Sequence, residues 1–249
     1  MDVQTTAIIL AAGYGKRLGG ENQKTLMRIL GKPMLVHLIG TLKQCDLAKI
    51  IVVIGFQKEK VIEELKNEDV TFVEQTQLLG TGHAVMMTEA VLSNFSGNVF
   101  VLCGDVPFLT ADTLKALRQT HRNLRAHCTL LTAIIDNPYG YGRIIRNNSG
   151  EIIRIVEQAN ANEKEKQIKE INAGVYIFVK DALFEALAQI KPDPVKKEYY
   201  LTDVIGNFVS TGKKVASWTT PAPEETIGIN TPEDLKRAEQ YFLSLRRKI

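Results

Sequence analysis

A short apolar run near the N-terminus ends abruptly in a glycine-bearing loop. The run Ile-Ile-Leu at residues 8–10 has the length and composition of a strand buried in a parallel sheet. In the loop at residues 11–15, Gly13 and Gly15 allow backbone N–H groups to approach an anion without obstruction by a Cβ atom. The stretch from Ala7 to Lys24 therefore predicts a phosphate cradle at the end of a buried strand.

Two cations follow the glycines, at Arg17 and Lys24. Arginine can hold phosphate oxygens through a planar fork, whereas lysine acts as a mobile point charge. Two common phosphate motifs do not fit. Gln23 stands where a P-loop needs glycine before its lysine, and Leu18 stands where the Rossmann dinucleotide fingerprint needs a third small residue. For the loop taken alone, an ordinary glycine-rich turn stays open as the alternative.

Helical and strand patterns alternate along the first 138 residues. Helical spacing of apolar residues predicts helices near 33–43, 59–66, 84–90 and 111–122. Compact apolar runs predict strands at 49–54, 70–74, 99–102 and 128–135. This alternation predicts an α/β fold with a Rossmann-like, mostly parallel, doubly wound mixed sheet. Asp105 directly follows one of the strands, at the sheet edge where ligands of open α/β sheets bind.

The pattern changes from about residue 139. Residues 142–146 and 151–157 flank the turn Asn147-Asn148-Ser149-Gly150 and predict a β-hairpin. A strand at 171–179, a helix near 182–190 and a strand at 215–219 are expected next. Thr231 can cap a C-terminal helix that has Pro232 in its first turn. We expect residues 1–249 to form one domain, and no train of hexapeptide repeats follows it.

The composition indicates which kinds of binding partner the protein is expected to lack. The formal net charge of +3 is too small to favour nucleic acid or a membrane surface, and no apolar run approaches the length of a membrane span. Cys45, Cys103 and Cys128 are widely spaced, so they indicate neither a disulfide framework nor a zinc site. We therefore expect a cytoplasmic protein with no nucleic-acid or membrane partner. The sequence predicts no particular oligomeric state.

A series of short motifs resembles the sugar-1-phosphate nucleotidyltransferases. The motifs are the opening loop followed by LGTGHA, GDVP, GYGRI, VE, INAG, EYYLTD and GIN, in the order of that family, and they extend from about residue 6 to residue 235. The sequence is most similar to the uridylyltransferase (pyrophosphorylase) domain of the bacterial N-acetylglucosamine-1-phosphate uridyltransferases. The resemblance implies the nucleotide-diphospho-sugar transferase fold, with a small hairpin subregion for the sugar. It also implies a magnesium-dependent reaction of UTP with a sugar 1-phosphate that yields a UDP-sugar and pyrophosphate.

The resemblance also implies roles for individual residues. The residues matching the nucleotide contacts are Leu10, Ala12, Gly13, Gly15, Gln75, Gly80 and Thr81, of which Gln75 and Gly80 would read uracil. The residues matching the sugar contacts are Gly142, Glu157, Asn172, Tyr200 and Thr202. Asp105 and Asn230 match the ligands of Mg²⁺, while Arg17 and Lys24 match the catalytic cations on the phosphates. On this assignment, residues 1–138 and 215–235 form the nucleotide and metal side, and residues 139–205 form the sugar side.

Elementary chemistry is compatible with these roles. Mg²⁺ prefers oxygen ligands and keeps several waters, so one carboxylate, one amide oxygen and substrate phosphates would suffice to hold it. The sugar phosphate is already an anionic nucleophile, so direct in-line attack on the α-phosphorus of UTP requires no activated side chain. Without the resemblance, Glu157 would be read as a surface residue at a hairpin end and Asn172 as an ordinary strand end.

The sequence departs from the family pattern at three positions, of which Cys103 bears on sugar preference. Cys103 stands where the most similar relatives carry an aromatic residue that touches the ligand, and Lys16 and Gln23 replace a threonine and a proline of the loop. Two alternatives stay open: a nucleotidyltransferase for another sugar or base, and a non-catalytic nucleotide-sugar sensor. The joint presence of Arg17, Lys24, Asp105 and Asn230 favours an enzyme.

Overall fold

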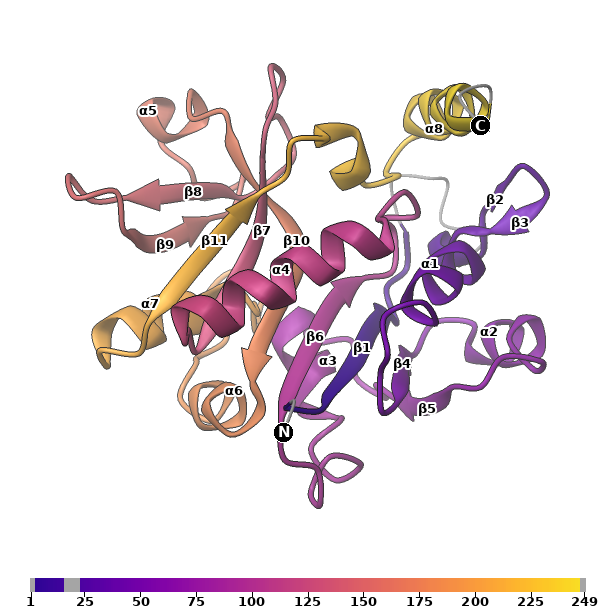
Figure 1. Ribbon diagram of the computed structural model, residues 1–249, viewed down its shortest axis with the longest axis horizontal. Helices are drawn as coiled ribbons and strands as arrows, with labels where there is room; N and C mark the ends of the chain where they lie inside the picture. The colour runs from indigo at the N-terminus through magenta and orange to yellow at the C-terminus, as the bar shows by residue number, and fades with distance from the viewer. Residues whose placement is uncertain (1–2, 16–22, 247–249) are drawn as a thin grey trace.

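The strand predicted at residues 8–10 lies at the middle of a mixed sheet in the computed structural model, which describes residues 3–15 and 23–246. The described residues form a nine-stranded sheet with the main order β11-β7-β10-β6-β1-β4-β5, and β8 and β9 extend it from β10 (Figure 1). The strands are β1 (Thr5–Ala11), β4 (Ile50–Ile54), β5 (Thr71–Glu74), β6 (Asn98–Cys103), β7 (Cys128–Ile134), β8 (Arg143–Arg146), β9 (Ile152–Val156), β10 (Glu170–Val179) and β11 (Val215–Thr219).

Along the main order of the sheet most neighbouring strands are parallel, and β10 is the exception; the added strands β8 and β9 pair antiparallel with each other, and β8 with β10. β1 pairs in parallel with β4 and β6, β4 pairs in parallel with β5, and β11 pairs in parallel with β7. β10 lies between β6 and β7 and is antiparallel to both. The predicted mostly parallel, mixed sheet is confirmed. The sequence did not place β10 in the centre, because a run of apolar residues does not specify its neighbours.

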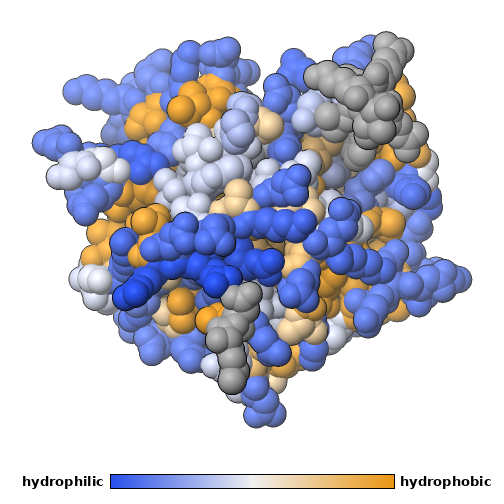
Figure 2. Space-filling model, viewed as in Figure 1, coloured by the Kyte–Doolittle hydropathy of each residue, from blue (hydrophilic) through white to orange (hydrophobic). Residues whose placement is uncertain are grey.

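Helices cover both faces of the sheet, which confirms the doubly wound arrangement. On one face pack α1 (Met34–Leu42), α2 (Lys58–Glu64) and α4 (Ala111–Leu124). On the other pack α3 (Thr81–Met86), α6 (Lys180–Leu187) and α7 (Asp203–Ser210). Helix α4 crosses in front of the sheet in Figure 1, burying Leu114 and Leu117 beneath a hydrophilic outer surface (Figure 2). Shorter elements are η2 (Lys24–Leu26), β2 (Arg28–Ile29), β3 (Lys32–Pro33), α5 (Glu163–Lys166) and η3 (Pro223–Thr226).

The helix predicted over residues 84–90 is shorter than expected. α3 ends at Met86, and the chain continues in tight turns to residue 94. Thr88 explains part of the difference, because its hydroxyl donates to the Val85 carbonyl oxygen at 2.7 Å and its N–H donates to the same oxygen at 2.9 Å. Such local side-chain bonds compete with the regular helical pattern.

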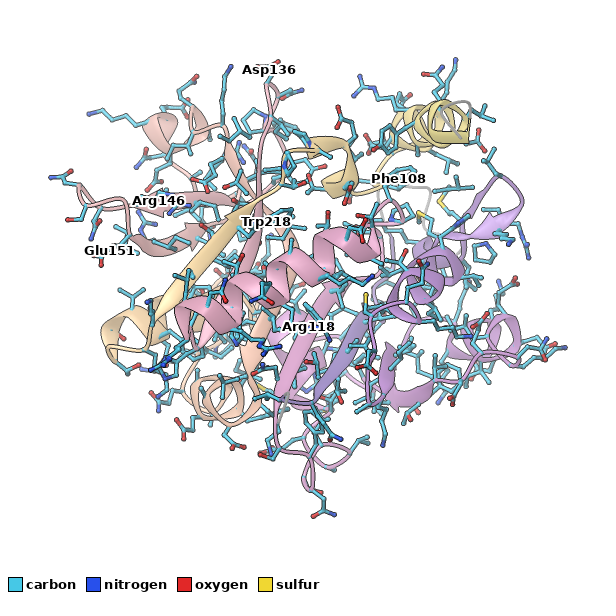
Figure 3. The ribbon with its side chains drawn as sticks, viewed as in Figure 1. Phe108, Arg118, Asp136, Arg146, Glu151 and Trp218 are labelled. Carbon is cyan, nitrogen blue, oxygen red and sulfur yellow. The ribbon has the colours of Figure 1, made fainter. Side chains whose placement is uncertain are left out.

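The predicted hairpin forms from β8 and β9. The Asn147 side-chain oxygen accepts hydrogen bonds from the N–H groups of Ser149 and Glu151, which closes the turn. Arg146 then ties the hairpin to β10 through two hydrogen bonds to the Glu170 carboxylate, from Nε at 2.8 Å and Nη2 at 2.6 Å. Figure 3 shows Arg146 and Glu151 on this projecting hairpin. The hairpin is thereby held as a wall beside the central strands.

The C-terminal helix α8 (Pro232–Arg246) begins as predicted. The Thr231 hydroxyl oxygen accepts a hydrogen bond from the Asp234 N–H, while the Asp234 carboxylate accepts bonds from the N–H groups of Asn230 and Thr231. The preceding segment is anchored by a hydrogen bond of 3.0 Å from the Ile229 N–H to the Asp105 carbonyl oxygen. This bond places Asn230 beside the end of β6. Among the described helices, none combines the length and apolar character needed to cross a membrane.

One buried histidine makes the stability of this fold depend on pH. His121 in α4 is 2% exposed, and its Nδ1 lies 3.0 Å from the Thr129 hydroxyl oxygen. Burial, assisted by the nearby His127, lowers the pKa of His121 to about 4, whereas an unfolded histidine has a pKa of about 6.5. Between these values the unfolded chain binds a proton that the folded chain does not. The free energy of unfolding should therefore fall as the pH falls through this window.

We predict that His121→Gln removes this part of the pH dependence. At pH 7.5 the variant should be less stable than the wild type by about 1–3 kcal/mol, a typical cost for a disturbed buried site. At pH 5.0 the difference should shrink, because the wild type then loses the stabilisation of its neutral histidine. Urea unfolding at the two pH values measures both differences, and an equal difference at both would contradict the prediction.

Candidate active site

A pocket of about 240 Å³ lies at the carboxyl ends of β1 and β6, between the central strands and the hairpin. It brings together eight residues that the sequence analysis selected: Leu10, Thr81, Asp105, Gly142, Glu157, Asn172, Thr202 and Asn230. They come from segments separated by up to 220 residues, from 10 to 230. Residues predicted for the nucleotide side and residues predicted for the sugar side therefore lie together at this end of the strands.

Lys24 contacts two of these residues at once. Its ammonium group donates to Asp105 Oδ2 in a close ion pair and to Asn230 Oδ1 at 2.8 Å. The Asn230 Nδ2 group donates to the Gly228 carbonyl oxygen at 3.1 Å, which leaves Oδ1 to face the ammonium. The lysine and asparagine side chains thus meet at the carboxylate that follows β6, and two oxygen atoms converge on a single cationic group.

Close backbone packing around this ion pair requires glycine at two positions. A Cβ atom on Gly104 would lie 2.9 Å from the Leu10 carbonyl oxygen and 2.9 Å from Thr25 Cγ2. Gly15 has φ +60°, and a Cβ atom there would lie 2.7 Å from Lys24 Cβ. Gly15 is therefore needed for the approach of the loop to Lys24. Gly13 shows no such crowding, because nothing lies within 4 Å of the corresponding position.

The Gln23 side chain holds the backbone near Ala11 and Thr25 in place. Gln23 is 1% exposed; its Nε2 donates to the Ala11 carbonyl oxygen, and its Oε1 accepts from the Thr25 N–H at 3.3 Å. Its backbone has φ −61°, a value that proline also adopts. The hydrogen bonds of the Gln23 side-chain amide therefore restrain the backbone at this position. The resemblance implies a proline at the same position in the family. Arg17 and Lys16, which the sequence analysis also selected, lie outside the described residues.

The residues predicted to read uracil, Gln75 and Gly80, are not among the residues that line this pocket. Gln75 is 4% exposed, and its Nε2 donates to the Gly80 carbonyl oxygen and lies 3.0 Å from His83 Nδ1. Gly80 has φ +95°, and a Cβ atom on it would lie 2.6 Å from the Tyr199 carbonyl oxygen. Thr81, by contrast, lines the pocket.

Two further predicted nucleotide contacts follow β1 and lie outside the lining. Ala12 is buried, and its carbonyl oxygen accepts from the Phe56 N–H at 3.0 Å. Gly13, the next residue, is exposed. Beyond β1, the chain therefore changes from the buried, hydrogen-bonded Ala12 to the solvent-exposed Gly13.

The predicted sugar side is mostly assembled on one wall. Thr202 donates to Glu157 Oε1 at 3.2 Å, and the Asn172 N–H donates to the Gly142 carbonyl oxygen at 2.9 Å. A Cβ atom on Gly142 would lie 2.9 Å from Ile155 Cγ2, so the position suits glycine. Tyr200 stands apart from the pocket lining, and its ring instead faces the Lys196 ammonium at 5.9 Å.

Burial controls the protonation of the groups in this wall. Desolvation raises the pKa of Glu157, and the hydrogen bond from Thr202 partly opposes that change. Desolvation, reinforced by the Asp105 charge, raises the pKa of Cys103 to about 12. Cys103 is thus a neutral thiol at ordinary pH and a poor nucleophile. The site offers carboxylate, amide and hydroxyl groups for binding rather than an activated nucleophile.

Some pocket residues were missed by sequence reasoning. Tyr141 lines the pocket, and its hydroxyl oxygen accepts a hydrogen bond of 3.2 Å from the Gly228 N–H, which links the hairpin side to the segment carrying Asn230. Its motif, GYGRI, was recognised, so a closer reading could have found it. Tyr176 also lines the pocket. It lies outside every motif, and a tyrosine in an apolar strand is indistinguishable from a core residue.

Comparison with known proteins gives consistent findings. The model of a family described as the MobA-like NTP transferase domain matches residues 7–197. The chain is 44% identical over 243 residues to the bifunctional protein GlmU of Streptococcus gordonii and 46% identical over 243 residues to that of Streptococcus thermophilus. Each match covers 98% of this chain and 52% of the relative. The chain thus spans about half the length of the curated relatives it matches.

Solved structures with the same fold include a UDP-glucose pyrophosphorylase complexed with UDP-glucose, with a TM-score of 0.75 and 20% identity over 97% of this chain and 99% of that one. A putative glucose-1-phosphate thymidylyltransferase from Bacillus anthracis gives a TM-score of 0.76 at 23% identity, over 95% and 94% of the two chains. The predicted fold class and the resemblance to sugar-1-phosphate nucleotidyltransferases are confirmed.

We predict that Glu157→Gln stabilises the folded chain at neutral pH. The raised pKa of Glu157 means that its charged form is less favourable in the folded chain than in the unfolded chain. This cost is complete above the folded pKa and disappears below the unfolded value of about 4.3. The variant should therefore melt at a higher temperature at pH 7.5, by about 2–4 °C for each kcal/mol relieved, and the gain should shrink towards pH 4.5.

Glu89→Gln serves as the control, because Glu89 is exposed and the same amide change there relieves no burial. Thermal unfolding of both variants at several pH values provides the measurement. A Glu157→Gln variant that melts at or below the wild-type temperature at pH 7.5 would argue against a carboxylate that desolvation makes destabilising.

Proposed function

The chain belongs to the MobA-like NTP transferase family, and from this premise we propose that it is a UTP-dependent sugar-1-phosphate uridylyltransferase. Its proposed reaction joins UTP and N-acetylglucosamine 1-phosphate into UDP-N-acetylglucosamine and pyrophosphate, a cell wall precursor pathway step that would occur in the cytoplasm. The observation that carries the proposal is that two sets of polar groups meet at one pocket. Asp105 and Asn230 hold the Lys24 ammonium, and Glu157 and Asn172 add polar groups to the same pocket. The fold neighbour complexed with UDP-glucose supports a UDP-sugar as product.

The cation site suits a divalent metal, for which we propose Mg²⁺. The ammonium of Lys24 acts as a stand-in cation, because it is held by one carboxylate oxygen and one amide oxygen. Among the described residues, no group of three or more His, Cys, Asp or Glu side chains could hold a metal. A site with few protein ligands is typical of Mg²⁺, which also binds substrate phosphates and water. When bound there, Mg²⁺ would neutralise phosphate charge, and Asp105 and Asn230 would hold it.

The chain's own cations have a separate role. Lys24 lies close to Gly15 of the glycine loop, and its ammonium reaches Asp105 just beyond β6. We propose that Lys24 and Arg17 bind phosphate oxygens and stabilise the pyrophosphate as it leaves. The loop backbone at Ala12, Gly13 and Gly15 would lie against the nucleotide, with Leu10 and Thr81 beside it. Gln75 retains Oε1 as an acceptor for the base while Gly80 keeps its amide in place.

On the sugar side, the proposed contacts are the ring hydroxyls and the acetamido group. Glu157 can accept hydrogen bonds from hydroxyls, and Asn172 can donate to an oxygen. Gly142, Thr202 and Tyr200 complete the proposed set. The sugar 1-phosphate supplies its own anionic oxygen as nucleophile, so the site's task is to align that oxygen with the α-phosphorus and to reduce charge repulsion. The division into a nucleotide side (1–138 and 215–235) and a sugar side (139–205) remains part of this proposal.

Pyrophosphate release tests the proposed function directly. The protein is incubated with Mg²⁺, each nucleoside triphosphate in turn, and a panel of sugar 1-phosphates. We expect the fastest release with UTP and N-acetylglucosamine 1-phosphate. Faster release with a different pair would instead identify a related nucleotidyltransferase. No release with any pair, although the protein binds UDP-N-acetylglucosamine, would favour the non-catalytic sensor.

We further predict that Lys24→Met increases metal affinity in the absence of nucleotide. In the wild type the ammonium neutralises Asp105 and occupies the two oxygens that a metal would need. One unit charge about 4 Å away contributes roughly 1–4 kcal/mol, so its removal should tighten binding about tenfold or more. Mn²⁺ titration followed by electron paramagnetic resonance measures this without turnover.

Lys58→Met is the matched control, since Lys58 pairs with Glu74 at 2.6 Å on the surface and the variant loses the same charge. Its Mn²⁺ affinity should equal that of the wild type. If Lys24→Met bound Mn²⁺ no more tightly than Lys58→Met, the two oxygens beside Lys24 would not be the metal ligands.

A further inference from the structure

Tyr176 is a pocket residue to which the proposed reaction assigns no role. It lies in β10, is 3% exposed, and lines the same pocket as Glu157 and Asn172. Its ring stacks on Phe178 with centroids 5.5 Å apart, so its position is fixed by the core. The hydroxyl group is therefore presented to the pocket by a rigid strand.

The orientation of the neighbouring Asn172 amide is determined by the backbone. The Gly174 N–H donates to Asn172 Oδ1 at 3.2 Å, and an N–H group can only donate. The amide nitrogen must then face the other way, and it donates to the Tyr176 hydroxyl oxygen at 2.6 Å. A bulge between Asn172 and Tyr176, with Gly174 at φ +69°, brings the two side chains together.

Two hydrogen-bond donors remain at this point. The Tyr176 oxygen accepts from Asn172, so the phenolic proton must be donated elsewhere, and burial raises the pKa of Tyr176 so that this proton stays bound. Within residues 3–15 and 23–246, neither this proton nor the second hydrogen of Asn172 Nδ2 is donated to a protein acceptor. Tyr176 is buried, and buried donors are normally paired, so its proton points to an acceptor that a ligand would bring, while the half-buried Asn172 amide offers a second donor beside it.

The neighbouring strand leaves space for such a ligand. Cys103 ends β6, and Tyr176 pairs with Val101 of the same strand, so Cys103 and Tyr176 belong to the same face of the sheet. The thiol lies against Gly174, where a Cβ atom would approach Sγ to 2.8 Å. Thus a small thiol side chain ends β6 beside the bulge, on the face of the sheet that carries Tyr176.

We propose that Tyr176 is a specificity residue that donates a hydrogen bond from its hydroxyl to an acceptor oxygen of the sugar, beside a second donor from Asn172. The inference rests on the proposed function. It adds a residue of β10, Tyr176, that would recognise the sugar. The acceptor is an oxygen atom of the sugar, either the acetamido carbonyl oxygen or a ring hydroxyl oxygen. Tyr176 should therefore affect the binding of the sugar phosphate and leave that of UTP unchanged.

Tyr176→Phe tests the inference, because it removes the hydroxyl and retains the ring. KM is measured for UTP, for N-acetylglucosamine 1-phosphate and for glucose 1-phosphate. The loss of one hydrogen bond should raise the KM for the sugar phosphate about 3- to 10-fold, with the KM for UTP within about 2-fold of the wild type. An increase confined to the acetamido sugar identifies the carbonyl oxygen, and an increase for both sugars identifies a ring hydroxyl. An unchanged KM for both would overturn the inference.

A matched variant and a binding measurement separate this effect from a loss of folding. Tyr241→Phe makes the same change on α8, where the ring packs edge-on against Phe108, and it should leave all three KM values unchanged. Calorimetric titration with UDP-N-acetylglucosamine and with UDP should show weaker binding of the first alone in Tyr176→Phe. Equal losses for both ligands would overturn the inference. Failure of the proposed function would appear separately, as absence of pyrophosphate release by the wild type.

Discussion

The close contact of the Lys24 ammonium with Asp105 and Asn230 is the interaction on which the site depends. It joins the glycine loop after β1, the turn after β6 and the segment before α8, which are distant in sequence. Each group would be costly to bury alone, because a charge of 16–21% side-chain exposure is largely removed from water. The glycines at 15 and 104 and the bond from Ile229 to the Asp105 carbonyl bring the three groups close enough to satisfy one another.

The sheet explains why a second set of polar groups faces this ion pair. β10 runs antiparallel between β6 and β7, so Asn172, near its N-terminal end, lies close to the C-terminal end of β6. The hairpin and the segment before α7 add Gly142, Glu157 and Thr202 to the same pocket. Burial raises the pKa of Glu157 there, a cost to stability that is typical of a group retained for binding. The fold thus brings the contact of Lys24 with Asp105 and Asn230 and the polar groups of Glu157 and Asn172 to one strand end.

Local patterns were sufficient to predict most elements and the glycine loop, because apolar spacing, turn residues and the Thr231 cap act over a few residues. Gly15, Lys24 and Asp105, which were selected from separate motifs, lie together, since Gly15 lies close to Lys24 and Lys24 pairs with Asp105. Contacts set by strand order could not be predicted. The central place of β10, the link from Tyr141 to Gly228, and the bond between Asn172 and Tyr176 depend on which strands become neighbours and on a bulge. The shortened α3 reflects in part the local bonds of Thr88, which compete with the helical pattern.

The most direct measurement is a crystal structure of the protein with Mn²⁺ and UDP-N-acetylglucosamine, using anomalous diffraction to locate the metal. If Asp105 and Asn230 hold the metal, the anomalous peak should lie within coordination distance, about 2.0–2.3 Å, of Asp105 and Asn230 oxygen atoms. The Lys24 ammonium should then contact phosphate oxygens, and the sugar should lie against Glu157, Asn172 and Tyr176. A metal bound elsewhere, with Lys24 still paired to Asp105 in the presence of the nucleotide sugar, would contradict the central claim.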